Sequence, residues 1–101
     1  MENRSDSQVV IQHELNGKKG AFFVEKEGNR LAEMTYSKIN DQLIIIDHTE
    51  VSDALRGQGV GRAMVQQSVE MARDQNIKIL PLCPFAKSVF QKVEEIRDVL
   101  K

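Results

Sequence analysis

One stretch, residues 43–62, constrains the fold more than any other part of the chain. An apolar run ends at residues 48–51, a polar loop follows, and glycines then recur through residues 56–61. From Val60 onward the apolar residues take the spacing of an amphipathic helix. A strand, a glycine-rich turn and a helix N-terminus in this order are typical of phosphate-binding sites. The first helical amides have no intrahelical acceptor, and they lie at the positive end of the helix dipole.

The composition of this turn fits a phosphate ligand. Gly57, Gly59 and Gly61 let the backbone approach a ligand closely because glycine has no Cβ. Arg56 adds a guanidinium whose planar donors suit phosphate oxygens. The lysine-bearing P-loop motif does not occur, and the G-x-G-x-G spacing after a fourth strand does not fit a dinucleotide fold. Taken alone, the segment also fits a plain helix entry with a glycine turn.

Length and composition indicate one domain. The chain has 101 residues, 41% hydrophobic and 29% charged, which is ordinary for a globular protein. The net charge of −1 argues against a nucleic-acid or membrane partner. No apolar run could span a bilayer and no signal peptide is evident, so we expect a cytoplasmic protein. The single cysteine excludes an internal disulfide and a multi-cysteine metal site, and polar residues 1–7 are expected to be flexible.

The first half of the chain predicts an antiparallel sheet. Four segments are rich in β-branched or alternating apolar residues, namely 8–15, 19–25, 30–37 and 43–51. The dipeptide Asn16-Gly17 predicts a type I′ hairpin turn between the first two. The fourth segment begins apolar on both faces, which predicts a central strand covered on both sides.

The second half predicts a β-α-β unit with a further helix. Residues 59–74 should form a helix, 77–82 a short strand, and 84–100 a helix with a possible break at Val93. Strands 43–51 and 77–82 should be parallel, with a right-handed crossover between them. The fold class is therefore α+β, with four antiparallel strands, a parallel fifth strand and a C-terminal helix.

This order of elements resembles the acetyl-coenzyme-A-binding half of the GNAT acyltransferase fold. Arg56, Gly59 and Gly61 match the family's R-x-x-G-x-G signature. Residues 48–51, 55–61 and 83–88 resemble the short, single-domain YjdJ-type members. The resemblance covers about residues 8–100. It implies that acetyl-CoA is a co-substrate.

The resemblance also implies which residues hold the coenzyme. Backbone amides of residues 58–61 would bind the pyrophosphate, and Arg56 would add charge. The pantetheine arm would pair with the strand end near Glu50 and Val51, between strands that splay apart. Lys87 would pair with a coenzyme phosphate, unless it is only a surface lysine. The full expected set is Val51, Arg56, Gly57, Gln58, Gly59, Val60, Gly61, Arg62 and Lys87.

Two departures from larger GNAT enzymes affect the chemistry. Their acceptor-binding helices are replaced here by a two-residue turn, so the acceptor site must be open or shared. Where they often carry an asparagine and a tyrosine acid, this chain has Cys83 and Phe90. Phe90 has no hydroxyl and cannot protonate a departing thiolate.

Three residues are candidates for catalysis. Cys83 precedes a helix, whose dipole favours a thiolate, so it could carry the acetyl group, line the thioester or simply be buried. His48 and Glu50 share a strand face with Ile44 and Ile46, and either could be the base for an amine, unless they form a solvated strand end. A β-bulge would shift this parity.

The resulting prediction is an acetyl-CoA-dependent N-acetyltransferase acting on an unidentified amine, with no metal. The alternatives are a coenzyme-binding module that catalyses slowly or not at all, acting as a sensor or partner subunit, and a purely structural glycine turn. We expect a monomer or weak homodimer.

Overall fold

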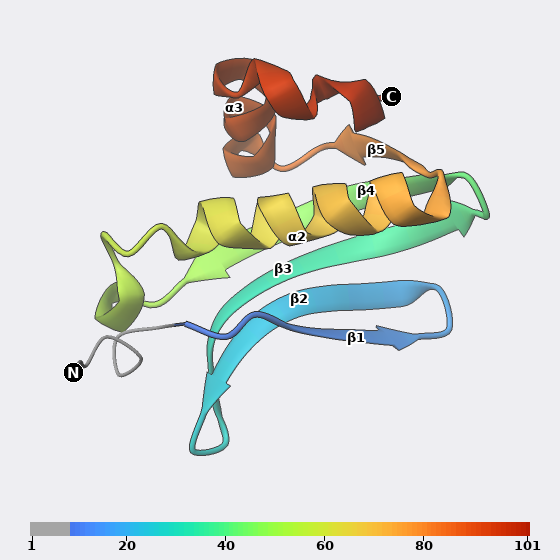
Figure 1. Ribbon diagram of the computed structural model, residues 1–101. Coiled ribbons are helices and arrows are strands. Elements are labelled where there is room, and N and C mark those ends of the chain that lie inside the picture. Colours follow the sequence, from blue (N-terminus) through green and yellow to red (C-terminus); the bar gives the residue numbers. More distant parts are fainter. Residues whose placement is uncertain (1–8) are drawn as a thin grey trace.

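The computed structural model describes residues 9–101, so the prediction that residues 1–7 are flexible lies outside the described residues. Five strands form one sheet in chain order: β1 (Gln12–Asn16), β2 (Lys19–Lys26), β3 (Asn29–Asn40), β4 (Leu43–Val51) and β5 (Lys78–Pro81). Strands β1 to β4 are antiparallel, and β5 is parallel to β4. A long helix, α2 (Val60–Gln75), runs along one face of this sheet (Figure 1). The predicted fold class is confirmed.

The first hairpin turns one residue later than predicted. Asn16 pairs with Lys19, so Gly17 and Lys18 are the central residues of the turn. Of these two, only Gly17 has a positive φ, at 67°. Positive φ at the first central position is the type II′ pattern, so the predicted type I′ turn is wrong.

Helix α2 begins and ends at left-handed residues. Gly59 precedes it with φ 72°, and Asn76 follows it with φ 60°. Its buried face carries Val60, Gly61, Met64, Val65, Ser68, Val69 and Ala72. The predicted helix 59–74 and its apolar stripe are thus confirmed to within one residue at each end. Most of the stability of such a helix comes from packing this face on the sheet.

The C-terminal segment breaks at Val93. Helix α3 (Pro84–Lys92) is followed by the 3₁₀ helix η2 (Glu94–Val99), and Val93 between them is extended. The possible break in the predicted helix 84–100 is therefore confirmed. Arg73 of α2 donates to both carboxylate oxygens of Asp98, which fixes η2 against α2.

Strand β4 carries a β-bulge that decides which side chains face the helix. Tyr36 pairs with Ile46 but Thr35 pairs with His48, so β4 has an extra residue, Asp47. Ile44 and Ile46 are fully buried. The alternate residues Leu43 and Ile45 are only partly buried, so the predicted covering of β4 on both faces is wrong.

An aromatic cluster joins the edge strand to the core. The ring of His13 stacks on Phe22 with centroids 4.3 Å apart, and its Nε2 lies 2.6 Å from the Tyr36 hydroxyl. Tyr36 is 2% exposed and lies over Gly20, where a Cβ would be 2.3 Å from its Cζ. Burial lowers the pKa of His13 and raises that of Tyr36. This contact joins residues 23 positions apart, and no local sequence pattern predicts it.

Candidate coenzyme and thiol site

The parallel strands β4 and β5 pair over only part of the length of β4. Their ladder ends where Ile46 faces Pro81. The amides of Leu82 and Cys83 both donate to the Ile46 carbonyl, and the chain then enters α3. Strand β4 continues to Val51, and among the described residues no strand pairs with this last part on the β5 side. The open edge can receive an extended ligand through backbone hydrogen bonds.

The glycine turn lies between the end of β4 and the start of α2. A short 3₁₀ helix, η1 (Asp53–Leu55), follows β4, and Gly57 and Gly59 then take φ values of 83° and 72°. A side chain at either glycine would have nothing within 4 Å, so the turn borders open space. The sequence requires glycine here for its backbone conformation.

The N-terminus of α2 presents free amides to this space. Gly59 caps the helix without a side-chain hydrogen bond. The first-turn amides of Val60, Gly61 and Arg62 have no intrahelical acceptor. Gln58 differs, because its amide donates to the Leu55 carbonyl at 3.3 Å. Of the four amides predicted to hold a pyrophosphate, that of Gln58 already has a partner.

Glycine is needed at position 61 for a different structural reason than at positions 57 and 59. A Cβ at Gly61 would lie 2.6 Å from the Cζ of Phe85. The ring of Phe85, in the first turn of α3, therefore packs directly on the first turn of α2. The sequence predicted that the missing side chain of Gly61 lets a ligand approach. That prediction is incomplete, because the missing side chain also lets the N-termini of α2 and α3 pack closely together.

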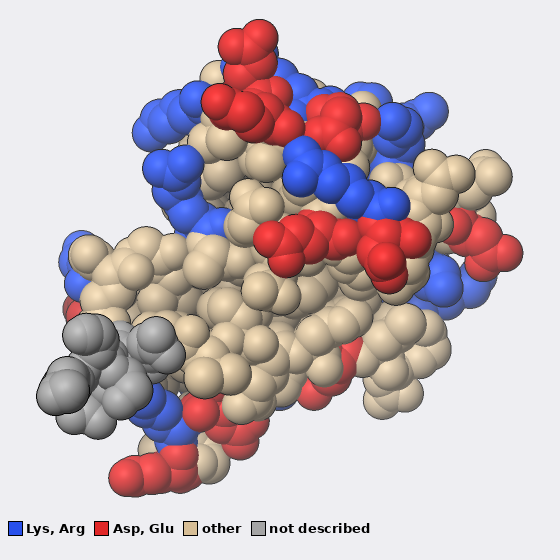
Figure 2. Space-filling model, in the orientation of Figure 1, with Lys and Arg blue, Asp and Glu red and all other residues tan. Residues whose placement is uncertain are grey.

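The predicted cationic side chains differ in where they lie. Arg56 pairs with Asp53, and both side chains are exposed. Arg62 is an exposed residue of the first turn of α2. Figure 2 shows a broad uncharged surface beside the N-terminal half of α2, with basic and acidic atoms at the edge near the loop before it and further charges around α3 and the other half of α2. Arg56 and Arg62 are therefore the two exposed cations that flank the glycine turn in the sequence.

Lys87 is an exposed residue near the start of α3. It lines a separate hollow of about 270 Å³ with Pro81, Phe90, Gln91, Arg97 and Leu100. Arg97 donates to the carbonyls of Phe90 and Gln91 at the end of α3. The pairing of Lys87 with a coenzyme phosphate stays a prediction.

Cys83 lies at the point where β4 and β5 separate. It is the N-cap of α3, it is 6% exposed, and its Sγ accepts a hydrogen bond from the Ala86 amide at 3.3 Å. The Oγ1 of Thr49 lies 3.1 Å from the same sulfur. The sequence placed Cys83 beside the strand ends but did not identify Thr49. The signal was available only if the bulge had been located, since the bulge turns Thr49 towards the helices.

The same bulge turns His48 and Glu50 away from Cys83. The prediction that they share a face with Ile44 and Ile46 is wrong, because Thr49 takes the inward position after the extra residue. The Nε2 of His48 lies 3.6 Å from Oε1 of Glu50, and these side chains are 55% and 80% exposed. The two candidate bases and the candidate thiol therefore lie on opposite faces of β4.

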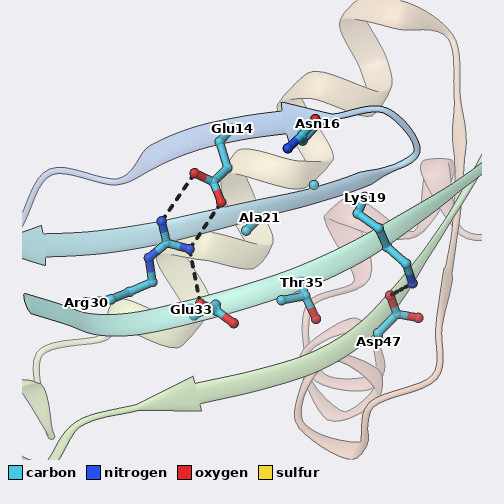
Figure 3. A pocket seen from close by; sticks show the side chains of 9 residues that line it. Glu14, Asn16, Lys19, Ala21, Arg30, Glu33, Thr35 and Asp47 are labelled. Carbon is cyan, nitrogen blue, oxygen red and sulfur yellow. Dashed lines mark hydrogen bonds and ion pairs between the residues drawn. The ribbon is translucent and has the colours of Figure 1, made fainter.

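The sheet face that carries His48 and Glu50 is polar and hollowed. A hollow of about 510 Å³ is lined by Glu14, Asn16, Lys19, Gly20, Ala21, Arg30, Glu33, Thr35 and Asp47. In Figure 3 Arg30 reaches between Glu14 and Glu33, and Lys19 points to Asp47. The hydrogen bond from Arg30 to Glu14 is the main cause of the raised pKa of Arg30. Charges in this hollow are largely paired with one another.

The described residues were also searched for a metal site and for a membrane-spanning helix. Residues 9–101 contain no group of three or more His, Cys, Asp or Glu side chains arranged to hold a metal ion. No helix in this part of the chain is long and apolar enough to cross a membrane.

Comparison with known families identifies this arrangement. The profile of the GCN5-related N-acetyl-transferase family matches residues 21–99, which include the whole of the glycine turn and Cys83. The chain belongs to the GCN5-related N-acetyltransferase family. Among curated proteins no sequence matches it significantly.

Solved structures of this family are similar to the chain over most of its length. A GCN5-like putative N-acetyltransferase from Staphylococcus aureus is 40% identical, with a TM-score of 0.68, over 89% of this chain and 87% of that one. A predicted acetyltransferase from Clostridium acetobutylicum, solved with acetyl-CoA, is 17% identical, with a TM-score of 0.59, over 74% and 56% of the two chains. The ribosomal-protein-S18-alanine N-acetyltransferase of Escherichia coli is 13% identical, with a TM-score of 0.62, over 87% and 55%. The last two show a shared fold.

Proposed function

We propose that this protein is an acetyl-CoA-dependent N-acetyltransferase. The observation that carries the proposal is the convergence of three features at one edge of the sheet. These are the open edge of β4, the free amides at the start of α2, and the thiol of Cys83 where β4 and β5 part. Family membership supports the same reaction class.

The proposed coenzyme position follows from these features. The pyrophosphate would accept hydrogen bonds from the amides of Gly59, Val60, Gly61 and Arg62, at the positive end of the α2 dipole. Gly57 would keep the turn in its open conformation, and Arg56 would leave Asp53 to add charge. The pantetheine amides would pair with β4 up to Val51, which brings the thioester towards Cys83.

The proposed chemistry has two branches because the thiol and the bases lie on opposite faces of β4. In direct transfer, an amine approaches from the polar face and His48 or Glu50 takes its proton. In the carrier branch, Cys83 first accepts the acetyl group and then passes it to the amine. Phe90 cannot supply an acid in either branch, since it has no hydroxyl and is 2% exposed.

A coenzyme-binding module without efficient catalysis is the second candidate. The same Phe90 favours it, and so does the two-residue turn between β1 and β2, which leaves the polar face without covering helices. An amine screen with acetyl-CoA separates the two candidates, because only an enzyme releases free coenzyme in step with acetylated amine.

The coenzyme site is tested by titration calorimetry with acetyl-CoA on Gly59→Ala and Gly28→Ala. Both glycines have positive φ, 72° and 82°, and open space around an added Cβ, so both variants should lose a similar ~1 kcal/mol of stability from backbone strain. Gly28 is in the turn between β2 and β3, far along the chain from α2. We expect acetyl-CoA affinity to fall about tenfold or more in Gly59→Ala only, a loss of about 1.4 kcal/mol of binding free energy. Equal affinities in the two variants would contradict the proposed site.

The two branches are separated by intact-mass measurement after mixing with acetyl-CoA. The carrier branch predicts one covalent acetyl group that is absent in Cys83→Ala. Direct transfer predicts no adduct, with amine acetylation surviving in Cys83→Ala and falling when His48 and Glu50 are replaced.

A further inference from the structure

Thr49 is the one side chain that the bulge brings to the sulfur of Cys83. Strand β4 turns His48 and Glu50 to the polar face and Thr49 to the helix face, where it faces Met34 of β3. Its Oγ1 lies 3.1 Å from Sγ of Cys83, from a strand 34 residues away in the sequence. This contact is tertiary and does not follow from the cap of α3.

The sulfur has a second donor of a different kind. The amide of Ala86 donates to Sγ at 3.3 Å, as the N-cap position of Cys83 requires. Among the described residues, no charged side chain is hydrogen-bonded to this sulfur. Its polar surroundings therefore consist of one amide and one hydroxyl, and the residue Cys83 is 6% exposed.

The protonation state of Cys83 sets the direction of the hydroxyl contact. A neutral thiol is a weak donor and a weak acceptor, so either partner could donate. A thiolate can only accept, and the Thr49 hydroxyl must then donate to it. Hydrogen bonds to a charged group are stronger than those to a neutral one, so the contact is strongest when the sulfur carries a negative charge.

We propose that Thr49 is a positioning residue that holds the sulfur of Cys83 at the β4–β5 opening and donates a hydrogen bond to it when it reacts. The proposal concerns the reactivity of the Cys83 sulfur. It rests on the proposed function only where this sulfur is said to take part in acetyl transfer. In that use, the Cys83 thiolate attacks the acetyl carbonyl, the new C–S bond forms, and the coenzyme C–S bond breaks. Negative charge passes from one sulfur to the other, and no proton is needed. In this step the Thr49 hydroxyl would donate first to the Cys83 sulfur and then to the departing coenzyme sulfur.

The test is the rate of thiol alkylation in the absence of coenzyme. Cys83 is the only cysteine in the chain, so alkylation by iodoacetamide reports on it alone. In Thr49→Val, which keeps the shape and removes the hydroxyl, we expect the alkylation rate near neutral pH to fall about tenfold, the effect of one hydrogen bond to a charged group.

Two further variants keep the test decisive. Thr49→Ser restores a hydroxyl and should restore the alkylation rate, which a purely structural role of Thr49 would not require. Thr35→Val removes the same hydroxyl from β3 on the polar face and should leave the alkylation rate unchanged. An unchanged alkylation rate in Thr49→Val, or no recovery in Thr49→Ser, would overturn the proposal. Acetyl-CoA affinity, measured separately, would decide the proposed function whatever the outcome here.

Discussion

Gly20 offers the most direct test of how the sheet is packed. It lies in β2, where it pairs with Tyr36 of β3, and the Tyr36 ring crosses the space that a side chain would occupy. In Gly20→Ala, the new Cβ would lie 2.3 Å from Cζ and 2.5 Å from the hydroxyl oxygen of Tyr36. No real Cβ contact is so short, so the ring must move. Tyr36 is 2% exposed, and it therefore has little free space to move into.

The expected cost is worked out from three contributions. Overpacking a buried site costs ~1–3 kcal/mol. Displacing the ring also lengthens the contact between the Tyr36 hydroxyl and His13 Nε2, 2.6 Å in the structure, at a cost of ~1 kcal/mol. Alanine recovers ~0.5–1 kcal/mol because it restricts the unfolded chain more than glycine does. We expect a net loss of about 2 kcal/mol, and a melting temperature lower by roughly 10 °C.

The assay is urea unfolding of Gly20→Ala with the same substitution in a Tyr36→Leu background. Leucine is shorter than tyrosine and lacks its outer ring atoms, so the added methyl should cost little there. The difference between the two backgrounds is the coupling energy between the positions. The packing argument is refuted if Gly20→Ala unfolds within about 0.5 kcal/mol of the parent, or if its cost is the same in both backgrounds.

Two other outcomes are expected from the structure. In Gly61→Ala the new Cβ would lie 2.6 Å from Cζ of Phe85, and because Phe85 is partly exposed the ring can swing away. Stability should therefore fall by only ~1 kcal/mol, while the acetyl-CoA affinity measured by calorimetry should fall more. In a Phe85→Ala background the same substitution should no longer lower stability, but the affinity should stay low. Burial lowers the pKa of His13 from its usual 6.5, so the unfolded chain binds more protons than the folded one between the two values. This contribution to stability is complete above about pH 6.5 and is lost as the pH falls towards the lower folded pKa; urea unfolding at several pH values should show the slope, and His13→Phe should reduce it, whereas an equal slope in that variant would contradict the assignment.

Local patterns predicted most of the elements. Spacing of apolar residues predicted the helix from Val60 onward, and the glycines before it marked its start. The run of isoleucines predicted the fourth strand. The dipeptide Asn16-Gly17 predicted a tight turn between the first two strands. The turn itself was placed one residue too early, because strand register depends on pairing along the whole hairpin and not on the two turn residues alone.

Side-chain placement at the site depended on tertiary structure. The chain order alone determined that a glycine turn would join β4 to α2 and that Cys83 would precede α3, since both are properties of neighbouring residues. The inward turn of Thr49, the outward turn of His48 and the packing of Phe85 on Gly61 were decided only by the folded sheet. A β-bulge changes the face of every later residue in its strand, and its position is set by pairing with the neighbouring strand, which no local pattern encodes.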